Sequence, residues 1–332
     1  SLSGYLLGGG LGWNSGAWGI ACHNVLEVEV VLADGSLVTA SDTQNPDIFW
    51  AVRGAGPEFF GIVTSYRLRL QPMPRAIRTS VWTYPLQRIA EVERWMTAIM
   101  ATAPNTLEFS AVMTAAPPPL AELTAHTVSA VATVFADSEA EAAEILAQVG
   151  AGAPEEALDV QAGMPTPFDV LYQIMGQFFP EGLRFAADTN WASDGAGLFA
   201  GLAQSIAEAP SPRSFGLGVV LPSAKPAQLP DAAFSMVAPV FSCAYAVWPD
   251  ATADADNMDW LRATSARLSP LSAGHYIGEA DLERPERTRA CFAPAAWSRL
   301  TALQQRYDPH GLFHRPTLAL APACRPTREA AF

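Results

Sequence analysis

Lysine is almost absent from this chain of 332 residues, because Lys225 is the only one of the 20 basic residues that is not an arginine. A Walker-type phosphate loop requires a lysine directly after a glycine, so this class of nucleotide-binding site is excluded. A lysine Schiff base is likewise excluded everywhere except at position 225.

Basic charge in general is scarce, since the 20 basic residues face 33 acidic ones and leave a formal net charge of −13. A surface this acidic repels the phosphates of nucleic acids and the headgroups of anionic lipids. The longest uncharged stretch, residues 232–249, contains Pro239 and is shorter than a comfortable membrane span. We therefore expect no nucleic-acid partner and no membrane partner.

Metal-binding and nucleophile motifs are also missing. The four cysteines form no C-x-x-C pair, the five histidines form no H-E-x-x-H pattern, and no G-x-S-x-G occurs. These absences predict no metal site, no thioredoxin-type redox pair and no serine-hydrolase nucleophile elbow. The simplest interpretation of Cys22, Cys243, Cys291 and Cys324 is that they are reduced, structural thiols.

Glycine, by contrast, is concentrated near the start of the chain, at positions 8, 9, 10, 12, 16 and 19. This density predicts that residues 4–19 form a loop whose backbone makes close approaches. The loop is not a dinucleotide fingerprint, because Ser15 stands where G-x-G-x-x-G needs its third glycine and a strand follows the loop instead of preceding it. Two interpretations remain, a loop that grips a planar or anionic ligand and a purely structural turn.

Hydrophobic periodicity predicts two differently organised regions that meet near residue 75. The first region has expected strands at 26–32, 36–40 and 62–70 and a helix that begins at Pro46. The second has expected strands at 78–84, 106–114, 123–135, 215–221 and 234–247, and expected helices at 86–101, 139–150, 195–209 and 256–268. Residues 151–190 have no regular pattern. The order of elements is typical of an α+β fold in which an antiparallel sheet carries helices on one face.

The last region begins near Gly274 and ends with an expected helix over residues 293–307. A short strand-like stretch precedes that helix and contains Tyr276, Glu279 and Asp281. On a strand the two carboxylates would share one face and the tyrosine would point away from them. Either the phenol or a carboxylate could act as a base. A surface acidic pair beside a core tyrosine explains the same spacing equally well.

Five motifs in order resemble one family of flavoproteins. They are GYLLGGGLG (4–12) with Trp18-Gly19 and Asn24-Val25, VVLADGSLV (30–38), NPDIFWAVRGAG (45–56), FFGIVTSYRLRL (59–70) and the closing Tyr307-Asp-Pro-x-Gly-Leu-Phe313. Together they resemble FAD-linked oxidases of the vanillyl-alcohol oxidase/p-cresol methylhydroxylase (PCMH) type with a berberine-bridge-enzyme-like C-terminal segment.

The resemblance implies a fold and a domain organisation. Residues 1–75 would be the second half of a PCMH-type FAD-binding domain, and residues 76–273 a substrate domain with an antiparallel sheet and flanking helices. Residues 274–332 would return to pack on the FAD domain. Ser1 falls inside the glycine motif, so the family's N-terminal FAD subdomain is expected to be missing, either because the sequence is an excerpt or because it is a truncated gene product. The cellular location stays open for the same reason, with the cytoplasm favoured.

The resemblance also implies an activity, an FAD-dependent transfer of hydride from an alcohol, amine or sugar carbon to flavin N5. The partners would be a small-molecule substrate and oxygen or another electron acceptor. The alternative is a flavin-free truncated remnant that only binds a ligand or a partner. Substrate-pocket residues would come mostly from the middle region, including Tyr172, Gln173, Phe178, Phe179 and Trp191.

Site residues carry over position by position. The expected flavin contacts are Gly8, Gly9, Gly10, Gly12, Trp13, Asn14, Gly19, Ile20 and Asn24, with Ile62 near the adenine. Tyr276 and Asp281 match the first tyrosine and the aspartate of the family's Y-x-N-Y-x-D pattern, but Gly278 and Glu279 replace its asparagine and second tyrosine. Tyr276 and Glu279 are therefore rival candidates for the catalytic base.

Overall fold

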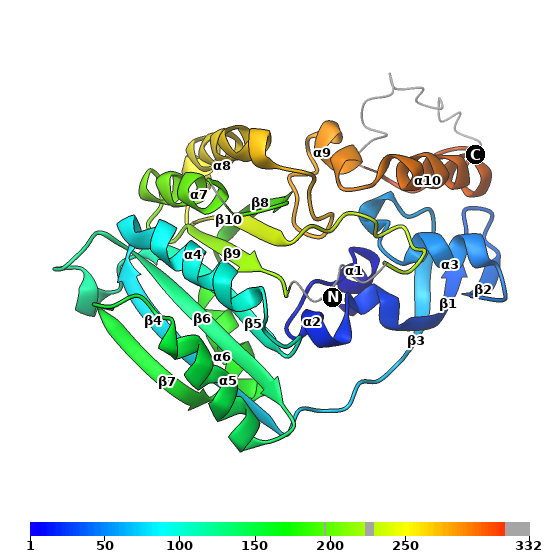
Figure 1. Ribbon diagram of the computed structural model, residues 1–332. Coiled ribbons are helices and arrows are strands. Elements are labelled where there is room, and N and C mark those ends of the chain that lie inside the picture. Colours follow the sequence, from blue (N-terminus) through cyan, green and yellow to red (C-terminus); the bar gives the residue numbers. More distant parts are fainter. Residues whose placement is uncertain (196, 223–228, 316–332) are drawn as a thin grey trace.

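Two antiparallel β-sheets, of three and seven strands, organise the chain (Figure 1). The computed structural model describes residues 1–195, 197–222 and 229–315, so Lys225 and Cys324 lie outside the described residues. The predicted α+β class and the antiparallel pairing are both confirmed. Single-turn 3₁₀ helices join the larger elements at Ala21–Asn24, Gly56–Glu58, Leu86–Arg88, Pro118–Leu120, Ala251–Ala253 and Ser269–Leu271.

The three-stranded sheet has the order β2–β1–β3, with β1 at Val25–Val31, β2 at Leu37–Ser41 and β3 at Ile62–Leu68. Alternation places Val28 and Val30 in the core and leaves Glu29 exposed, as the sequence pattern predicts. The pairing of Val28 with Tyr66 places the two predicted strands in one sheet.

Helices from both ends of the chain cover this small sheet. Helix α3 (Pro46–Val52) contacts β2, and α10 (Pro294–Tyr307) contacts α3. Phe60 stacks on Tyr307 with 5.2 Å between the ring centroids. The C-terminal segment thus shares a hydrophobic core with the first 60 residues (Figure 1).

The seven-stranded sheet has the order β7–β4–β6–β5–β9–β10–β8. Its strands are β4 (Ala76–Pro85), β5 (Leu107–Ala115), β6 (His126–Ala136), β7 (Asp159–Pro165), β8 (Arg184–Ala192), β9 (Phe215–Val220) and β10 (Val240–Trp248). One face packs on helices α4 (Ile89–Met100), α5 (Glu139–Ala151), α7 (Leu198–Ala207) and α8 (Asp254–Leu268). Gly218 lets α7 approach closely, because a Cβ there would lie 2.6 Å from the Phe199 ring.

The opposite face of this sheet meets the glycine segment and the C-terminal segment. Along β10, Phe241, Cys243, Tyr245 and Val247 point to this face and share a core with Ile20 and Tyr276, among other residues. Helix α6 (Phe168–Phe178) also packs on this side, against Ile77 and Phe135. The second face is therefore where elements distant in sequence converge.

Two helices in the glycine segment correct the prediction of a continuous loop. Helix α1 (Leu2–Leu7) contains only one glycine, and the Ser1 hydroxyl caps it by accepting the Gly4 N–H at 3.2 Å. Helix α2 (Ser15–Trp18) is a single turn that follows Asn14 in the left-handed region. The glycine-dense residues 8–12 between them remain non-helical, as predicted.

Three further expectations were wrong. Residues 151–190 contain β7, α6 and most of β8. Helix α6 packs on the second sheet face, and β7 and β8 pair with β4 and β10, which are tertiary effects without a local pattern. The strand expected from 234 starts only at Val240, because Phe234 packs against Gly9 and Gly54. The stretch after Gly274 is not a strand and makes only an isolated bridge between Gly274 and Trp191. The next helix is α9 (Pro285–Ala290).

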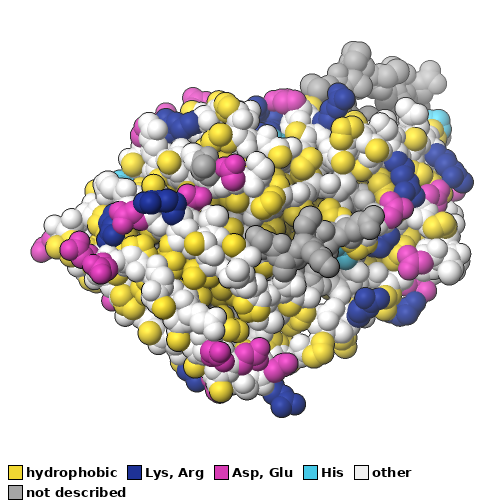
Figure 2. Space-filling model, in the orientation of Figure 1, with side chains coloured by type: hydrophobic (Ala, Val, Ile, Leu, Met, Phe, Trp, Pro, Cys, Tyr) yellow, Lys and Arg dark blue, Asp and Glu magenta, His cyan; other side chains and the backbone are white. Residues whose placement is uncertain are grey.

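The surface drawn in Figure 2 carries acidic and basic side chains interspersed around its rim, with hydrophobic side chains gathered in its middle. The negative charge is thus spread over this face instead of forming one patch. Among the described residues, no helix combines the length and the apolar character that a bilayer crossing requires.

Candidate functional site

A cavity of about 190 Å³ opens beside the glycine segment. Its lining combines backbone and side chains of residues 2–24 with the end of β3 and the residues after it. It is lined by Leu2, Tyr5, Leu6, Gly10, Trp13, Ser15, Trp18, Gly19, Ala21, Asn24, Leu68, Arg69 and Gln71. Four of the ten predicted flavin contacts, Gly10, Trp13, Gly19 and Asn24, are among these residues.

Close packing explains why two of the positions must be glycine. Gly9 has φ +103°, and a Cβ there would lie 2.4 Å from the Phe234 ring. Gly10 has φ +84°, and its Cβ would lie 2.7 Å from that of Ala21. Their carbonyls accept hydrogen bonds from the backbone of Cys22 at 2.8 Å and of Ala21 at 3.0 Å. The segment is thus folded back tightly on residues 20–22.

The other predicted contacts lie around the cavity or away from it. Gly8 packs against Gly278, the Gly12 N–H donates to the Ser15 hydroxyl at 3.0 Å, and Ile20 is buried in the core of the second sheet face. Ile62 is 57% exposed at the far end of β3, opposite Val31, and it does not line the cavity. Its contact with adenine stays a prediction.

Orphaned polar atoms in this segment fit a polar cofactor. Asn14 Oδ1 and His23 Nε2 are buried and have no hydrogen-bond partner. Burial of such an atom costs about 1–3 kcal/mol unless a partner is supplied. Asn14 stands between the cavity-lining residues Trp13 and Ser15, and His23 directly precedes Asn24. A ligand that brings polar groups to this segment would offer the partners that the protein lacks.

Tyr276 joins the C-terminal segment to the glycine segment. Its hydroxyl accepts hydrogen bonds from the Gly10 and Leu11 amides, each at 3.1 Å, and its side chain is buried. Burial raises the pKa of Tyr276 to about 12, although the two amide donors oppose the rise. The phenol is therefore neutral at physiological pH and fixed on the loop.

Glu279 lies one turn beyond Tyr276, since the Glu279 N–H donates to the Tyr276 carbonyl at 3.1 Å. The Tyr245 hydroxyl donates to Glu279 Oε2 at 3.0 Å. Burial raises the pKa of Glu279, and the hydrogen bond from Tyr245 partly offsets that rise. Asp281 does not join them, because its carboxylate accepts from Arg262 at 3.0 Å. The expected sharing of one face by Glu279 and Asp281 was wrong, because the stretch is a turn.

Sequence reasoning missed two residues on the second sheet face. Tyr245 lies on this face with Phe241 and Cys243 of β10, a strand that is buried throughout, and Glu108 lies on the half-buried side of β5. Glu108 accepts a hydrogen bond from the Asn14 amide at 3.2 Å, and burial raises the pKa of its carboxyl to about 7. Alternation could have placed both side chains on this face, but not what they contact.

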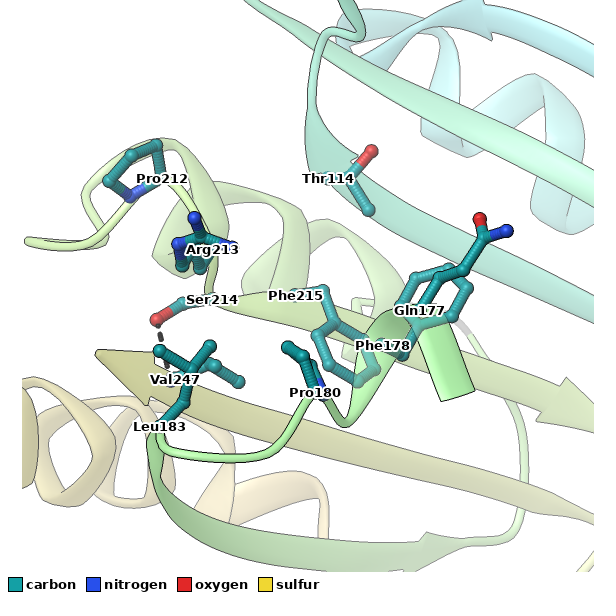
Figure 3. A pocket seen from close by; sticks show the side chains of 10 residues that line it. All are labelled: Thr114, Gln177, Phe178, Pro180, Leu183, Pro212, Arg213, Ser214, Phe215 and Val247. Atoms are coloured by element: carbon teal, nitrogen blue, oxygen red, sulfur yellow. Dashed lines mark hydrogen bonds between the residues drawn. The ribbon is translucent and has the colours of Figure 1, made fainter. Parts of the chain in front are cut away.

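A second pocket, of about 130 Å³, lies at the outer end of the same sheet face. Figure 3 shows Phe178 and Phe215 beside each other, with Thr114 across the opening. Phe215 in turn stacks on Tyr245, with 4.5 Å between the ring centroids. An aromatic wall thus runs from this pocket to the Tyr245–Glu279 pair.

The described ranges contain no group of three or more His, Cys, Asp or Glu side chains placed to hold a metal ion. Cys22, Cys243 and Cys291 are buried free thiols. Burial raises the pKa of Cys22 to about 12, so its thiol stays protonated at neutral pH.

Comparisons with known proteins concern the sequence family and the fold. No family model matches the chain. It is 27% identical over 311 residues to the FAD-linked oxidoreductase nodO of Hypoxylon pulicicidum, covering 93% of this chain and 67% of that protein. The chain therefore spans about two thirds of the length of this curated relative.

Solved structures share its fold. Glucooligosaccharide oxidase from Acremonium strictum superposes with a TM-score of 0.79 at 18% identity, over 96% of this chain and 70% of that one. Wild-type BBE-like 1 from Physcomitrella patens superposes with a TM-score of 0.77 at 17% identity, over 95% and 69%. These likenesses establish the fold alone.

The sequence relatives are named FAD-linked oxidoreductases, which supports an oxidoreductase of this class. The fold is that of solved berberine-bridge-enzyme-like structures, and the names of the sequence relatives support FAD, the cofactor that the resemblance implied.

Proposed function

We propose that the protein oxidises a small molecule at an alcohol, amine or sugar carbon. The observation that carries this proposal is the pair of hydrogen bonds from the Gly10 and Leu11 amides to the Tyr276 hydroxyl. These bonds bring the segment with the two base candidates onto the loop that resembles a flavin-binding loop. A sugar carbon stays in the proposal because the structural neighbour from Acremonium strictum is named for a glucooligosaccharide.

Bound FAD would supply the acceptor for the hydride, and oxygen or another acceptor would regenerate it. The residues that would hold it are those of the cavity beside the glycine segment, chiefly Gly10, Trp13, Gly19 and Asn24. Trp13 offers an aromatic face, and the two glycines let the backbone approach without a Cβ in the way. The unpartnered Asn14 Oδ1 would accept a hydrogen bond from the cofactor.

Glu279 is the better of the two base candidates. A base works best when its pKa lies near the operating pH. Burial moves the pKa of the Glu279 carboxyl upward toward neutrality, whereas it moves that of the Tyr276 phenol away to about 12. Glu279 would take the proton from the substrate hydroxyl or amine, with Tyr245 holding the carboxylate in place. Tyr276 would orient the loop.

The aromatic wall suggests where the substrate's bulk would lie. Phe178, Phe215 and Tyr245 form a continuous apolar surface that ends at Glu279. Such a surface favours a flat or apolar substrate face and excludes water from the carboxylate.

The proposal also assigns a role to each region of the chain. Residues 1–75 and 274–332 would hold the cofactor, and residues 76–273 would hold the substrate. The shared core of the two terminal regions supports this assignment.

Anaerobic stopped-flow reduction of the FAD-loaded chain tests the proposal. The candidate substrates to be tested are a glucooligosaccharide, a benzylic alcohol and a secondary amine. We expect one class to reduce the flavin and Glu279→Gln to slow that step at least tenfold. Tyr276→Phe should have a smaller effect. The controls are Glu283→Gln, an exposed carboxylate of the same segment, and Tyr84→Phe, whose hydroxyl donates to the Pro154 carbonyl in the other core. Parent-like reduction in Glu279→Gln would contradict the assignment of the base.

A further inference from the structure

A hydrogen-bonded row of buried polar side chains lies directly behind Tyr276. It consists of Asp188 on β8, Arg287 on α9 and His275, each at most 5% exposed. None of the three reaches the cavity beside the glycine segment or the pocket of Figure 3. The mechanism proposed above leaves them unused.

The first link is an ion pair between Arg287 and Asp188. Arg287 Nη2 donates to Asp188 Oδ2 at 2.6 Å, with both side chains almost fully buried. The same carboxylate oxygen accepts the Ser265 hydroxyl from α8. A buried pair of this kind often adds no more stability than apolar residues of the same volume. Arg287 Nε even stays without a partner, so stability alone accounts poorly for the pair.

The second link is His275, whose two ring nitrogens have different partners. Nδ1 lies 2.6 Å from the Thr189 carbonyl, which can only accept, so Nδ1 carries the proton. Nε2 then accepts a hydrogen bond from Arg287 Nη1. Burial, and next the Arg287 guanidinium, lower the pKa of His275, which keeps the ring neutral and Nε2 free to accept. The ring thus connects the ion pair to β8.

The third link ends at the backbone of Tyr276. The Tyr276 N–H donates to the Thr189 hydroxyl at 2.9 Å. Two residues earlier, the Gly274 carbonyl accepts the Trp191 N–H at 2.8 Å. The main chain around Tyr276 is therefore fixed to β8 on one side, while its hydroxyl reaches the Gly10 and Leu11 amides on the other.

We infer that Asp188, Arg287 and His275 are positioning residues that hold Tyr276, and through it the Gly10 and Leu11 amides, in the geometry of the flavin site. This inference rests on the proposed function for the role of that geometry in catalysis. The mechanical part does not, because it concerns contacts within the chain. The three links connect β8, at the edge of the seven-stranded sheet, to the Tyr276 backbone, and the Tyr276 hydroxyl continues the connection to the glycine segment through its two hydrogen bonds.

Hydrogen exchange of the cofactor-free chain, followed by mass spectrometry, tests the mechanical part. Tyr276→Phe should speed exchange in a peptide that covers residues 8–12 roughly two- to tenfold, the factor that one hydrogen bond contributes. Arg287→Lys keeps the charge but cannot bridge Asp188 and His275 together, so we expect the same local rise. The control Arg267→Lys removes a similar two-point contact, to Ser205 and Glu208, from helix α8. It should leave residues 8–12 at the parent rate.

A conservative pair of variants separates positioning from simple loss of structure. Thr189→Val keeps the shape but removes the oxygen that accepts the Tyr276 N–H, whereas Thr189→Ser retains that oxygen. We expect the local rise in the first and parent-like exchange in the second, with parent-like exchange in β6 for both. Parent-like exchange at residues 8–12 in Arg287→Lys or Tyr276→Phe would overturn the inference. So would a rise spread evenly over both sheets. Failure of the proposed function would appear separately, as absence of flavin reduction in the parent chain.

Discussion

Tyr245 donates a hydrogen bond from its hydroxyl to the Glu279 carboxylate at 3.0 Å, across 34 positions of sequence. One residue lies in the centre of a buried strand and the other in a turn of the C-terminal segment. No sequence motif at either position predicts the contact between Tyr245 and Glu279. Their contact gives the proposed base a fixed orientation and a pKa set by two opposing effects, burial and hydrogen bonding.

Replacement of Tyr245 by Phe should shift the pH profile of substrate oxidation. The Tyr245 hydroxyl lowers the pKa of Glu279, so its removal raises that pKa further. The active form of the base is the carboxylate, so the acidic limb of the rate profile should move to higher pH, by up to about one unit. The pH dependence of flavin reduction measures this shift, with Tyr84→Phe as the control. A limb that moves to lower pH would contradict the arrangement.

Replacement of Glu108 by Gln should stabilise the protein at alkaline pH. Burial raises the pKa of this carboxyl from 4.5 to about 7, so between these values the folded state binds more protons than the unfolded state. The parent's unfolding free energy therefore falls as pH rises through that window, on the order of 3 kcal/mol from this group. Denaturant unfolding at pH 5 and pH 8 should show a gain for Glu108→Gln only at pH 8. An equal gain at both would show that the buried charge is not its cause.

Two glycines with similar backbone angles but different surroundings make a matched pair. Gly9 (φ +103°) has the Phe234 ring where a Cβ would stand, whereas Gly35 (φ +82°) has open space. Gly9→Ala should therefore lose about 1–3 kcal/mol more stability than Gly35→Ala and weaken FAD binding as well. Thermal melting and FAD titration of both variants check this expectation. Equal losses of stability in the two variants would mean that backbone strain alone, and not the contact with Phe234, determines the cost of the substitution.

The sequence predicted the elements with local signals and missed those that depend on distant partners. Alternation and the Asp34-Gly35 turn define β1 and β2, and capping residues define α5. Helix α6 was missed because its apolar side chains are buried only by packing against Ile77 and Phe135, which are more than thirty positions away in sequence. Glycine density indicated the non-helical residues 8–12, and the resemblance indicated Tyr276. The Tyr245 contact and the link from Asp188 to Arg287, 99 positions apart, required three-dimensional coordinates.

Titration of the chain with FAD, followed by visible absorption and flavin fluorescence, tests the central claim most directly. The account predicts saturable binding with a perturbed flavin spectrum and quenched fluorescence, because Trp13 and Trp18 line the cavity. Gly9→Ala should weaken binding at least tenfold, whereas Gly35→Ala should bind like the parent. A flavin spectrum that stays identical to that of free FAD at every protein concentration would contradict the claim that the glycine segment holds the cofactor.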